Sequence, residues 1–295
     1  MADIKQLKIK IWSTKNIKKI TSAMEVISTI KFQKVKKSAE HLREYMNTFL
    51  GMLSALNTYT DIFPQPHSNA VRQFAVLVTS EKGLCGSLNS MLLKQFDVEY
   101  ETSKNNLDVF VVGKKWIEFC ARRGYTVVGT LHLADSFHSS DLQPLYDVLS
   151  SLQKDNTYRQ VKVWYNFFKN TMRQIPAWFQ LFPLSSEKFN EFMQVLEISI
   201  PKPLQKRQTN YMKLEPNQST IVKQSYDIMM NVIVYGAVLH NKTWEFAARM
   251  LAMKWAKDNA SNIIDDLTLA YNKARQDAIT KEVLEIVSAK AVLDS

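Results

Sequence analysis

The sequence predicts an α/β protein: a long antiparallel coiled coil of N- and C-terminal helices with a central Rossmann-like α/β domain of about five strands. Three observations predict this fold. Proline and glycine are almost absent from both ends, short β-branched and aromatic runs fill the middle, and five of the seven glycines lie between residues 83 and 129. Because glycine and proline interrupt helices, their scarcity favours long helices at the ends of the chain.

The first 58 residues are expected to form one helix. Residues 4–56 contain no proline and a single glycine, and apolar residues recur at three- and four-residue spacing. The later part of this stripe comprises Val35, Ala39, Leu42, Met46, Phe49, Leu53 and Leu56. An earlier stripe of Ile17, Ile20, Met24 and Ile27 has the same spacing in another phase. We therefore expect a seam that either shifts to another partner or unwinds near Ser28 to Lys31.

Residues 70–200 are expected to form the α/β domain. Five runs predict strands: FAVLVTS, LDVFVVG, YTVVG, VKVWYNFF and PAWFQLFPL. Helical stretches at 87–100, 114–123 and 142–154 alternate with them, the last with Asp141 as its expected N-cap. This alternation is typical of an α/β sheet that is partly parallel. Residues 185–215 are interpreted as a helix, an extended piece bounded by prolines, and a loop.

Residues 215–290 are expected to form a second long helix, since only Gly236 interrupts a tract with no proline after residue 216. At 1.5 Å per residue it would be on the order of 100 Å long. Its expected seam comprises Met250, Met253, Ala260, Ile264, Leu267, Tyr271, Ala274 and Ala278. Lys257 stands where an apolar residue would continue this seam. A helix this long needs a partner, and a chain that leaves and returns pairs its ends antiparallel.

The composition narrows the class of protein. The net charge is +10, and residues 1–44 hold eleven Lys and Arg against four Asp and Glu. That excess fits either a solvated face or an acidic partner, nucleic acid or lipid head groups. Cys85 and Cys120 form no CxxC pair, which favours a reduced compartment, and no apolar stretch is long enough to cross a membrane.

No motif in the sequence predicts catalysis or a bound cofactor or metal. The segment GLCGSLN at residues 83–89 lacks the GxxxxGK[ST] pattern of a phosphate loop, and we interpret it as a tight turn from a strand to a helix. The five histidines show no HxxxH or HExxH spacing. Asp265 and Asp266 are adjacent and point about 100° apart on a helix, so they cannot act as a facing pair.

Four motifs resemble the gamma subunit family of the F-type ATP synthases. They are KNIKKITSAM at 15–24, TSEKGLCGSLN at 79–89, ARMLAMKWAKDNA at 248–260 and LAYNKARQDAITKEVLEIV at 269–287. The resemblance covers residues 1–40, 74–95 and 244–293, whereas residues 96–215 share only the α/β character. The chain departs from the family pattern at Trp244-Glu245, at Lys257 and in the ending SAKAVL.

The resemblance implies a central rotor stalk that couples rotation of a proton-driven c-ring to ATP synthesis in a hexamer of alpha and beta subunits, and that regulates ATPase activity and proton flow. It implies one copy per complex, an epsilon subunit beside it, and no cofactor, nucleic acid or catalytic role of its own. The positions implied to contact the beta subunits are Met24, Lys18, Arg249, Arg275, Gln276, Thr280, Glu282 and Glu285. The start of the sequence has no targeting pattern, so a peripheral position on the cytoplasmic side of a bacterial inner membrane is expected.

Two other classes of function are compatible with parts of the sequence. A freestanding α/β enzyme with helical extensions would need a closed pocket and a perturbed nucleophile or base. A basic coiled-coil protein that binds nucleic acid would need clustered surface aromatics, and its binding would depend steeply on salt.

Overall fold

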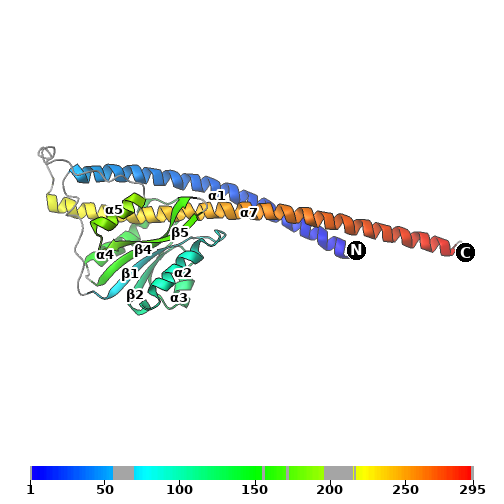
Figure 1. The fold of residues 1–295 in the computed structure, drawn as a ribbon, viewed down its shortest axis with the longest axis horizontal. Coiled ribbons are helices and arrows are strands. Elements are labelled where there is room, and N and C mark those ends of the chain that lie inside the picture. The colour runs from blue at the N-terminus through cyan, green and yellow to red at the C-terminus, as the bar shows by residue number, and fades with distance from the viewer. Residues whose placement is uncertain are drawn as a thin grey trace. The chain divides into compact units, whose positions relative to one another are not determined.

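The computed structural model describes residues 2–55, 70–154, 157–170, 173–195, 215 and 217–293. Its contacts divide the chain into two compact units. The helical unit comprises the described residues up to Ile30 and from Arg249 onward, and the sheet unit comprises those from Lys31 to Ala248. Two helices, α1 (Ala2–Ala55) and α7 (Gln218–Leu293), each continue from one unit into the other without a break (Figure 1).

The long helices predicted at both ends are confirmed. Their 54 and 76 residues correspond to about 80 and 110 Å. The predicted end of the first helix at residue 58 lies outside the described residues, and the second begins three residues later than predicted. In the sheet unit, Lys31 lies over the ring of Phe246, whereas Leu42 lies beside Gly236. Since one residue number rises as the other falls, the helices run antiparallel there.

The packing face of α1 follows one heptad register. Its buried and half-buried seam positions are Ile4, Leu7, Ile11, Thr14, Thr21, Glu25, Ser28, Phe32, Val35, Ala39, Leu42, Met46 and Phe49. The later predicted stripe is confirmed from Val35 to Phe49, and the side chains of Leu53 and Leu56 lie outside the described residues. The predicted unwinding near Ser28 to Lys31 is wrong, because α1 is unbroken there. Polar residues occupy the seam from Thr14 to Ser28 and leave Ile17, Ile20 and Ile27 exposed, so the alternative, that the earlier stripe packs on another partner, stays a prediction.

The sheet unit is built on the five strands that the sequence predicts. They are β1 (Arg72–Val78), β2 (Leu107–Val112), β3 (Thr126–Leu131), β4 (Tyr158–Asn170) and β5 (Arg173–Phe182). Their order is β3-β2-β1-β4-β5. Only the β4–β5 pair is antiparallel; the other three pairs are parallel. The sheet therefore has the mixed, Rossmann-like character that was expected.

Shorter helices cover both faces of this sheet. They are α2 (Leu88–Tyr100), α3 (Ile117–Arg122), α4 (Gln143–Lys154) and α5 (Ser186–Val195), with 3₁₀ turns at Lys104–Asn106 and Ser139–Leu142. One apolar core joins β-strand residues to α2 and α3, and the other joins them to α1, α4, α5 and α7. The expected extended piece and loop after α5 fall largely outside the described residues.

Asp141 caps the helix from a position other than the predicted one. His138 is the N-cap of the 3₁₀ turn, and its backbone N–H donates to Asp141 Oδ2 at 2.8 Å. The carboxylate therefore acts from the third position of a capping box. The prediction missed this because the 3₁₀ turn adds residues ahead of α4 that have no apolar periodicity of their own.

The segment 83–89 is a turn from β1 to α2, as predicted. Leu84 and Gly86 have φ values of 62° and 63°, and the polar groups around them bond to one another. Asn89 Nδ2 donates to Ser80 Oγ at 2.7 Å, and Ser80 N–H donates to Asn89 Oδ1 at 3.2 Å. These internal bonds give the turn a structural explanation without a bound phosphate.

Candidate partner interface

The seam of α7 in the helical unit matches the sequence prediction. Met253 and Ala260 are buried, and the other six predicted seam residues are half-buried. Lys257, which breaks the apolar pattern, donates to Glu25 Oε2 of α1 at 2.6 Å. This hydrogen bond, opposed by a smaller desolvation effect, raises the pKa of Lys257. The ammonium group of Lys257 is thus paired with a carboxylate of the opposing helix within the same chain.

The predicted contact residues lie in three different environments. Arg249 is buried, with 6% of its side chain and backbone surface exposed, and Met24 is half-buried. Lys18 is exposed on α1. The remaining five are all exposed on α7: Arg275, Gln276, Thr280, Glu282 and Glu285. The structure does not bring these side chains together into one cluster, so any contacts they make are spread along the helices.

The sequence analysis missed an apolar surface on the outside of the helical unit. Of the 24 exposed large apolar residues in the described part of the chain, 15 lie in this unit. Those on α1 are Ile9, Trp12, Ile17, Ile20, Val26, Ile27 and Ile30. Those on α7 are Trp255, Ile263, Leu269, Ile279, Val283, Leu284, Ile286 and Val287. Exposed apolar surface on this scale marks an interaction site.

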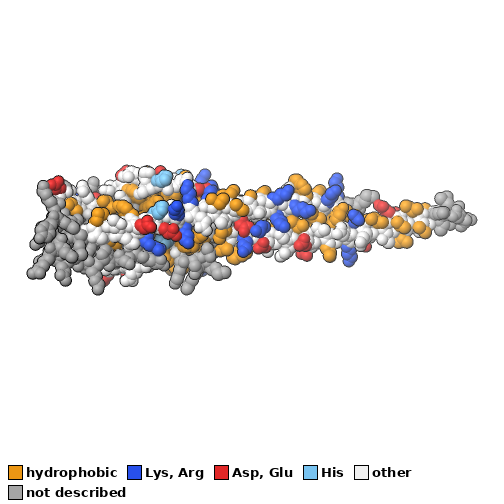
Figure 2. Space-filling model, turned by 90° about the horizontal axis from the view of Figure 1, so that it is seen from above, with side chains coloured by type: hydrophobic (Ala, Val, Ile, Leu, Met, Phe, Trp, Pro, Cys, Tyr) orange, Lys and Arg blue, Asp and Glu red, His pale blue; other side chains and the backbone are white. Residues whose placement is uncertain are grey.

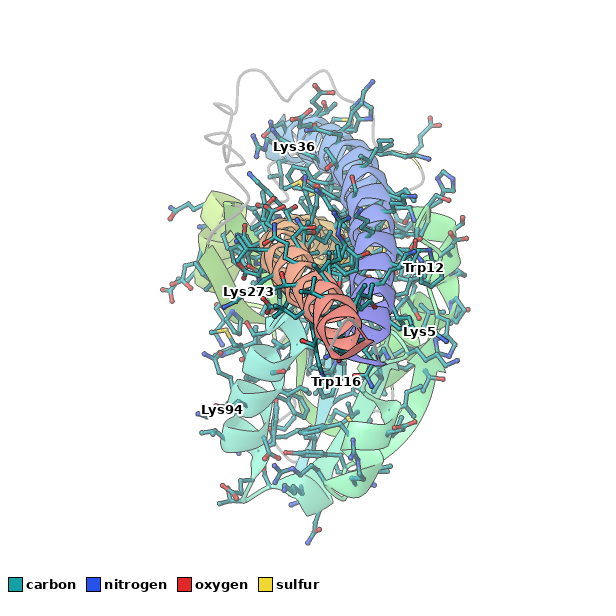
Figure 3. The ribbon with its side chains drawn as sticks, turned by 90° about the vertical axis from the view of Figure 1, so that its right-hand side faces the viewer. Lys5, Trp12, Lys36, Lys94, Trp116 and Lys273 are labelled. Carbon is teal, nitrogen blue, oxygen red and sulfur yellow. The ribbon has the colours of Figure 1, made fainter. Side chains whose placement is uncertain are left out.

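On α1 this apolar surface includes an open groove of about 860 Å³. Trp12, Val26 and Ile27 supply its apolar walls, and Lys15, Lys18 and Lys19 lie among them. Trp12 is 67% exposed and projects from the side of α1 that faces away from α7 (Figure 3). A partner that fits this groove would offer apolar side chains together with acidic ones.

The last described turns of α7 have no covered face at all. Seam residues as far as Ala278 are half-buried, but every residue from Ile279 to Ala289 is exposed. This segment includes Val283, Leu284, Ile286 and Val287, which at about 100° per residue fall within one arc of about 160° and so form one broad apolar face. A sequence signal for it exists, since Val283, Leu284, Ile286 and Val287 have the i, i+1, i+3, i+4 spacing of an apolar helix face.

Basic and apolar side chains alternate over the paired helices. Figure 2 shows Lys and Arg side chains interspersed with hydrophobic ones along both, with fewer acidic groups. This combination favours an apolar partner surface with acidic residues at its rim. A continuous acidic or basic stripe, as a nucleic-acid groove would need, is not the pattern seen on this face.

The polar groups of the sheet unit serve the fold. Glu81 accepts a hydrogen bond from the backbone N–H of Leu133 at 2.7 Å, and Cys120 is buried, which raises its pKa to about 11. Among the described residues, no three His, Cys, Asp or Glu side chains gather as metal ligands. Within the same ranges, no helix combines the length and hydropathy needed to cross a bilayer.

The chain is similar to a known family and to solved structures over nearly its whole length. A family model described as ATP synthase matches residues 3–293. A chain of the Euglena gracilis mitochondrial ATP synthase structure containing OSCP, F1 and c-ring is 22% identical, with a TM-score of 0.69 over 99% of this chain and 95% of that one.

Two further structures share the fold. A chain of the Euglena gracilis mitochondrial ATP synthase rotor is 18% identical, with a TM-score of 0.65 over 94% of this chain and 99% of that one. A chain of the Tetrahymena thermophila mitochondrial ATP synthase central stalk and c-ring is 21% identical, with a TM-score of 0.57 over 80% and 99%. Together with the family match, they identify this chain as a member of the gamma subunit family of F-type ATP synthases, a family of stalk subunits.

Proposed function

We propose that the chain is the central rotor shaft of an F-type ATP synthase and performs no chemistry itself. In this proposal the helical unit stands inside a hexamer of alpha and beta subunits, and the sheet unit meets a proton-driven c-ring. Rotation of the ring turns the shaft, which changes the nucleotide affinity of each beta subunit in turn. The same coupling lets the shaft regulate ATPase activity and proton flow.

The observation that carries the proposal is the exposed apolar surface of the helical unit. The segment 281–289 has no covered residue, and Val283, Leu284, Ile286 and Val287 all face outward. An uncovered apolar face is unfavourable in water, and an apolar surface on a partner subunit would cover it. A freestanding enzyme or a nucleic-acid binder gives no reason for an uncovered apolar face at the end of one long helix.

The mechanism follows from asymmetry rather than from a reactive group. Trp12 and the groove lysines decorate one side of α1, whereas α7 presents a different set of exposed residues. Three chemically equal beta subunits therefore face three different surfaces at any one angle. Because a subunit shifts toward the conformation that binds its neighbour best, turning the shaft moves each beta subunit through its states.

The predicted contact residues receive roles in this scheme. The exposed Arg275, Gln276 and Thr280 are assigned to the loops and bearing of the beta subunits, with Glu282 and Glu285 beyond them. Lys18 belongs to the groove on α1, and the half-buried Met24 lies on the same helix. Charged side chains at such positions form and break charge-assisted hydrogen bonds as the rotor turns.

Arg249 differs from the others because it is buried. We expect Arg249→Ala to uncouple ATP hydrolysis from proton pumping, since the position lies where α7 passes from the sheet unit to the helical unit. The measurement is ATP-driven proton pumping and ATPase activity in the same membrane vesicles. Coupled ATP synthesis at the level of the unsubstituted complex would contradict this role.

The partners proposed are three alpha and three beta subunits, one epsilon subunit and a c-ring, with one copy of this chain per complex. The test is purification of the tagged chain from its native membranes, followed by mass spectrometry and an ATPase assay. Recovery of alpha, beta and epsilon subunits with ATPase activity that the isolated chain lacks supports the proposal. A lone chain that turns over a substrate would overturn it.

The membrane face is also testable. The expectation of a peripheral protein on the cytoplasmic side of a bacterial inner membrane stays a prediction, and the similar structures described above come from mitochondria. Fractionation of the source cells distinguishes a bacterial inner membrane from a mitochondrial membrane. Enrichment with bacterial inner membranes and release by chaotropic salt would support the bacterial location, and enrichment with mitochondrial membranes would overturn it.

A further inference from the structure

Strand β4 and helix α7 are joined by a buried amide pair inside the sheet unit. Asn241 Oδ1 accepts a hydrogen bond from the side-chain Nδ2 of Asn166 at 2.9 Å and another from its backbone N–H at 3.3 Å. Both residues have no exposed surface. Hydrogen bonds are directional, so this pair fixes the angle at which α7 presents Asn241 to the sheet.

An aromatic contact lies next to the amide pair. Phe168, two residues along β4, packs edge-on against Trp244 of α7 with ring centroids 5.6 Å apart. The same ring packs edge-on against Phe32 of α1 at 5.7 Å. One side chain of the sheet therefore contacts both long helices. Rotation of either helix about its axis would break this aromatic geometry, and rotation of α7 would also break the amide pair.

A third contact ties α1 to the loops of the sheet. Lys31 of α1 and Lys82 of the turn after β1 both donate to Asp135 Oδ2. Burial alone would raise the pKa of Asp135, but the hydrogen bonds from the two ammonium groups outweigh it and lower the pKa to about 2. The carboxylate is thus held charged and bridges one long helix to two loops.

The buried amide pair is polar and directional, unlike most of the packing between α7 and the sheet unit. Elsewhere α7 meets the sheet unit mainly through apolar residues such as Ile233 and Val238, and the hydrogen bond from Tyr226 OH to the carbonyl oxygen of Leu181 is longer, at 3.5 Å. Apolar packing is non-directional, so a helix can turn or slip along such a surface with little loss. Buried polar pairs are best known for fixing register, at some cost in stability.

We infer that Asn166, Asn241, Phe168, Trp244 and Phe32 form a lock that transmits torque between the sheet unit and the two long helices. The inference rests on the proposed rotor function and adds where the load passes within the chain. If the sheet unit receives rotation from a c-ring, the load reaches α1 and α7 through these directional contacts. The lock is then a set of positioning residues and not a partner interface.

The test uses an assembled complex of this chain with alpha and beta subunits. A probe attached through Val98→Cys on α2, an exposed position in the sheet unit, makes the measured load pass through the lock. The natural Cys85 and Cys120 are buried and leave the new thiol as the reactive one among the described residues. ATP-driven rotation of the probe is recorded with and without an opposing load.

The variant is Asn166→Leu combined with Asn241→Leu. Removing both side-chain amides leaves neither of them without its partner and keeps the side-chain volumes close, so the fold is expected to survive the loss of the longer 3.3 Å bond from the backbone N–H of Asn166. We expect rotation without load to match the unsubstituted chain, and the load at which the probe slips to fall at least two-fold. An unchanged slipping load would overturn the lock. If the double variant fails to assemble, Asn241→Ser, which shortens the side chain and breaks the pair, gives the same test.

The matched control is another amide pair that lies within the sheet. Gln160 Nε2 on strand β4 donates to Gln73 Oε1 on strand β1 at 2.9 Å. Gln73→Leu combined with Gln160→Leu should leave the slipping load unchanged. If the slipping load falls as much in this control as in the Asn166 and Asn241 variant, the effect does not belong to the contact between α7 and the sheet. A complex of the unsubstituted chain whose probe never rotates would contradict the proposed function instead of the lock.

Discussion

Replacing glycine by alanine is expected to change the free energy of unfolding in opposite directions at two positions, Gly113 and Gly51. Gly113 has a φ of 104°, and a Cβ built there would lie 2.6 Å from the carbonyl oxygen of Thr79. Gly51 lies within α1, and no atom among the described residues comes within 4 Å of its added Cβ. We expect Gly113→Ala to lower the free energy of unfolding by about 1–3 kcal/mol and Gly51→Ala to raise it by about 0.5–1 kcal/mol. Urea unfolding of both variants is the measurement, and a loss at Gly51 as large as at Gly113 would contradict the explanation.

His240 makes a pH-dependent prediction. Its ring lies 5.0 Å from that of Phe167, and burial, assisted by the charge of Arg43, lowers its pKa from 6.5 to about 4. Between these values the unfolded chain binds a proton that the folded chain does not, so stability rises with pH in this window and falls as the pH drops. The slope is at most about 1.4 kcal/mol per pH unit.

Thermal unfolding between pH 7 and pH 4.5 checks this slope, with His240→Phe as the control. The variant keeps an aromatic ring against Phe167 and removes the titrating nitrogens. Its melting temperature should depend less on pH than that of the unsubstituted chain. Parallel curves for the two proteins would assign the pH dependence to other groups.

Single residues also mark where sequence reasoning stopped. Lys257 interrupted the apolar pattern, but its partner Glu25 lies 232 positions earlier in the chain, and no local rule pairs them. Trp244 departed from the family pattern, and its explanation is the edge-on contact with Phe168 of β4. Both pairings depend on how separate elements meet, which periodicity does not specify.

At the scale of the elements, the five strands and the two long helices could be predicted because each carries a strong local signal. Strands have β-branched runs, and the long helices have few breakers. The earlier half of the α1 seam could not, because Thr14, Thr21 and Ser28 occupy packing positions while Ile20 and Ile27 face outward. Apolar periodicity locates a helix face that will be covered, but it does not say whether the cover is the chain itself or a partner.

The seam of α7 supports a direct comparison of covered and uncovered apolar residues. Met253 is buried in the seam, whereas Ile263 is 49% exposed on the same helix. Met253→Ala should destabilise the isolated chain by about 2 kcal/mol, and Ile263→Ala should change its stability by less than about 0.5 kcal/mol. Hydrogen exchange of amides in residues 249–275 is the measurement. Similar losses of protection in the two variants would show that the helices do not pack as described.

At the scale of the whole molecule, the candidate interface could be predicted only in part. The resemblance supplied the exposed positions on α7, but the apolar surface around Trp12 and at residues 283–287 emerged from burial. A sequence lists apolar residues without saying which of them remain uncovered after folding. The fold had to be known first.

The end of α7 carries the prediction for assembly. Changing Val283, Leu284, Ile286 and Val287 to Ser should leave the melting temperature of the isolated chain within a few degrees, because these side chains bury little surface in it. Assembly with alpha and beta subunits should weaken at least ten-fold, measured by co-purification over a concentration series. Changing four exposed charged residues of α7 instead, Asp258, Asp265, Asp266 and Lys273, is the control. Equal assembly by the two variants would contradict an apolar partner surface against this end of α7.

The polar seam of α1 has a consequence for synthesis on the ribosome. Residues 2–30 leave the ribosome about 220 residues ahead of Arg249, their partner region in the helical unit, which at 5–20 residues per second is a delay of about 10 to 40 s. Throughout that delay the helix exposes Trp12, Ile20 and Ile27 on one side. Between residues 14 and 28 the other side carries Thr14, Thr21 and Ser28, so this part of the helix offers nascent chains on neighbouring ribosomes one apolar face instead of two. The residues that weaken the finished coiled coil thus protect the unfinished chain from aggregation.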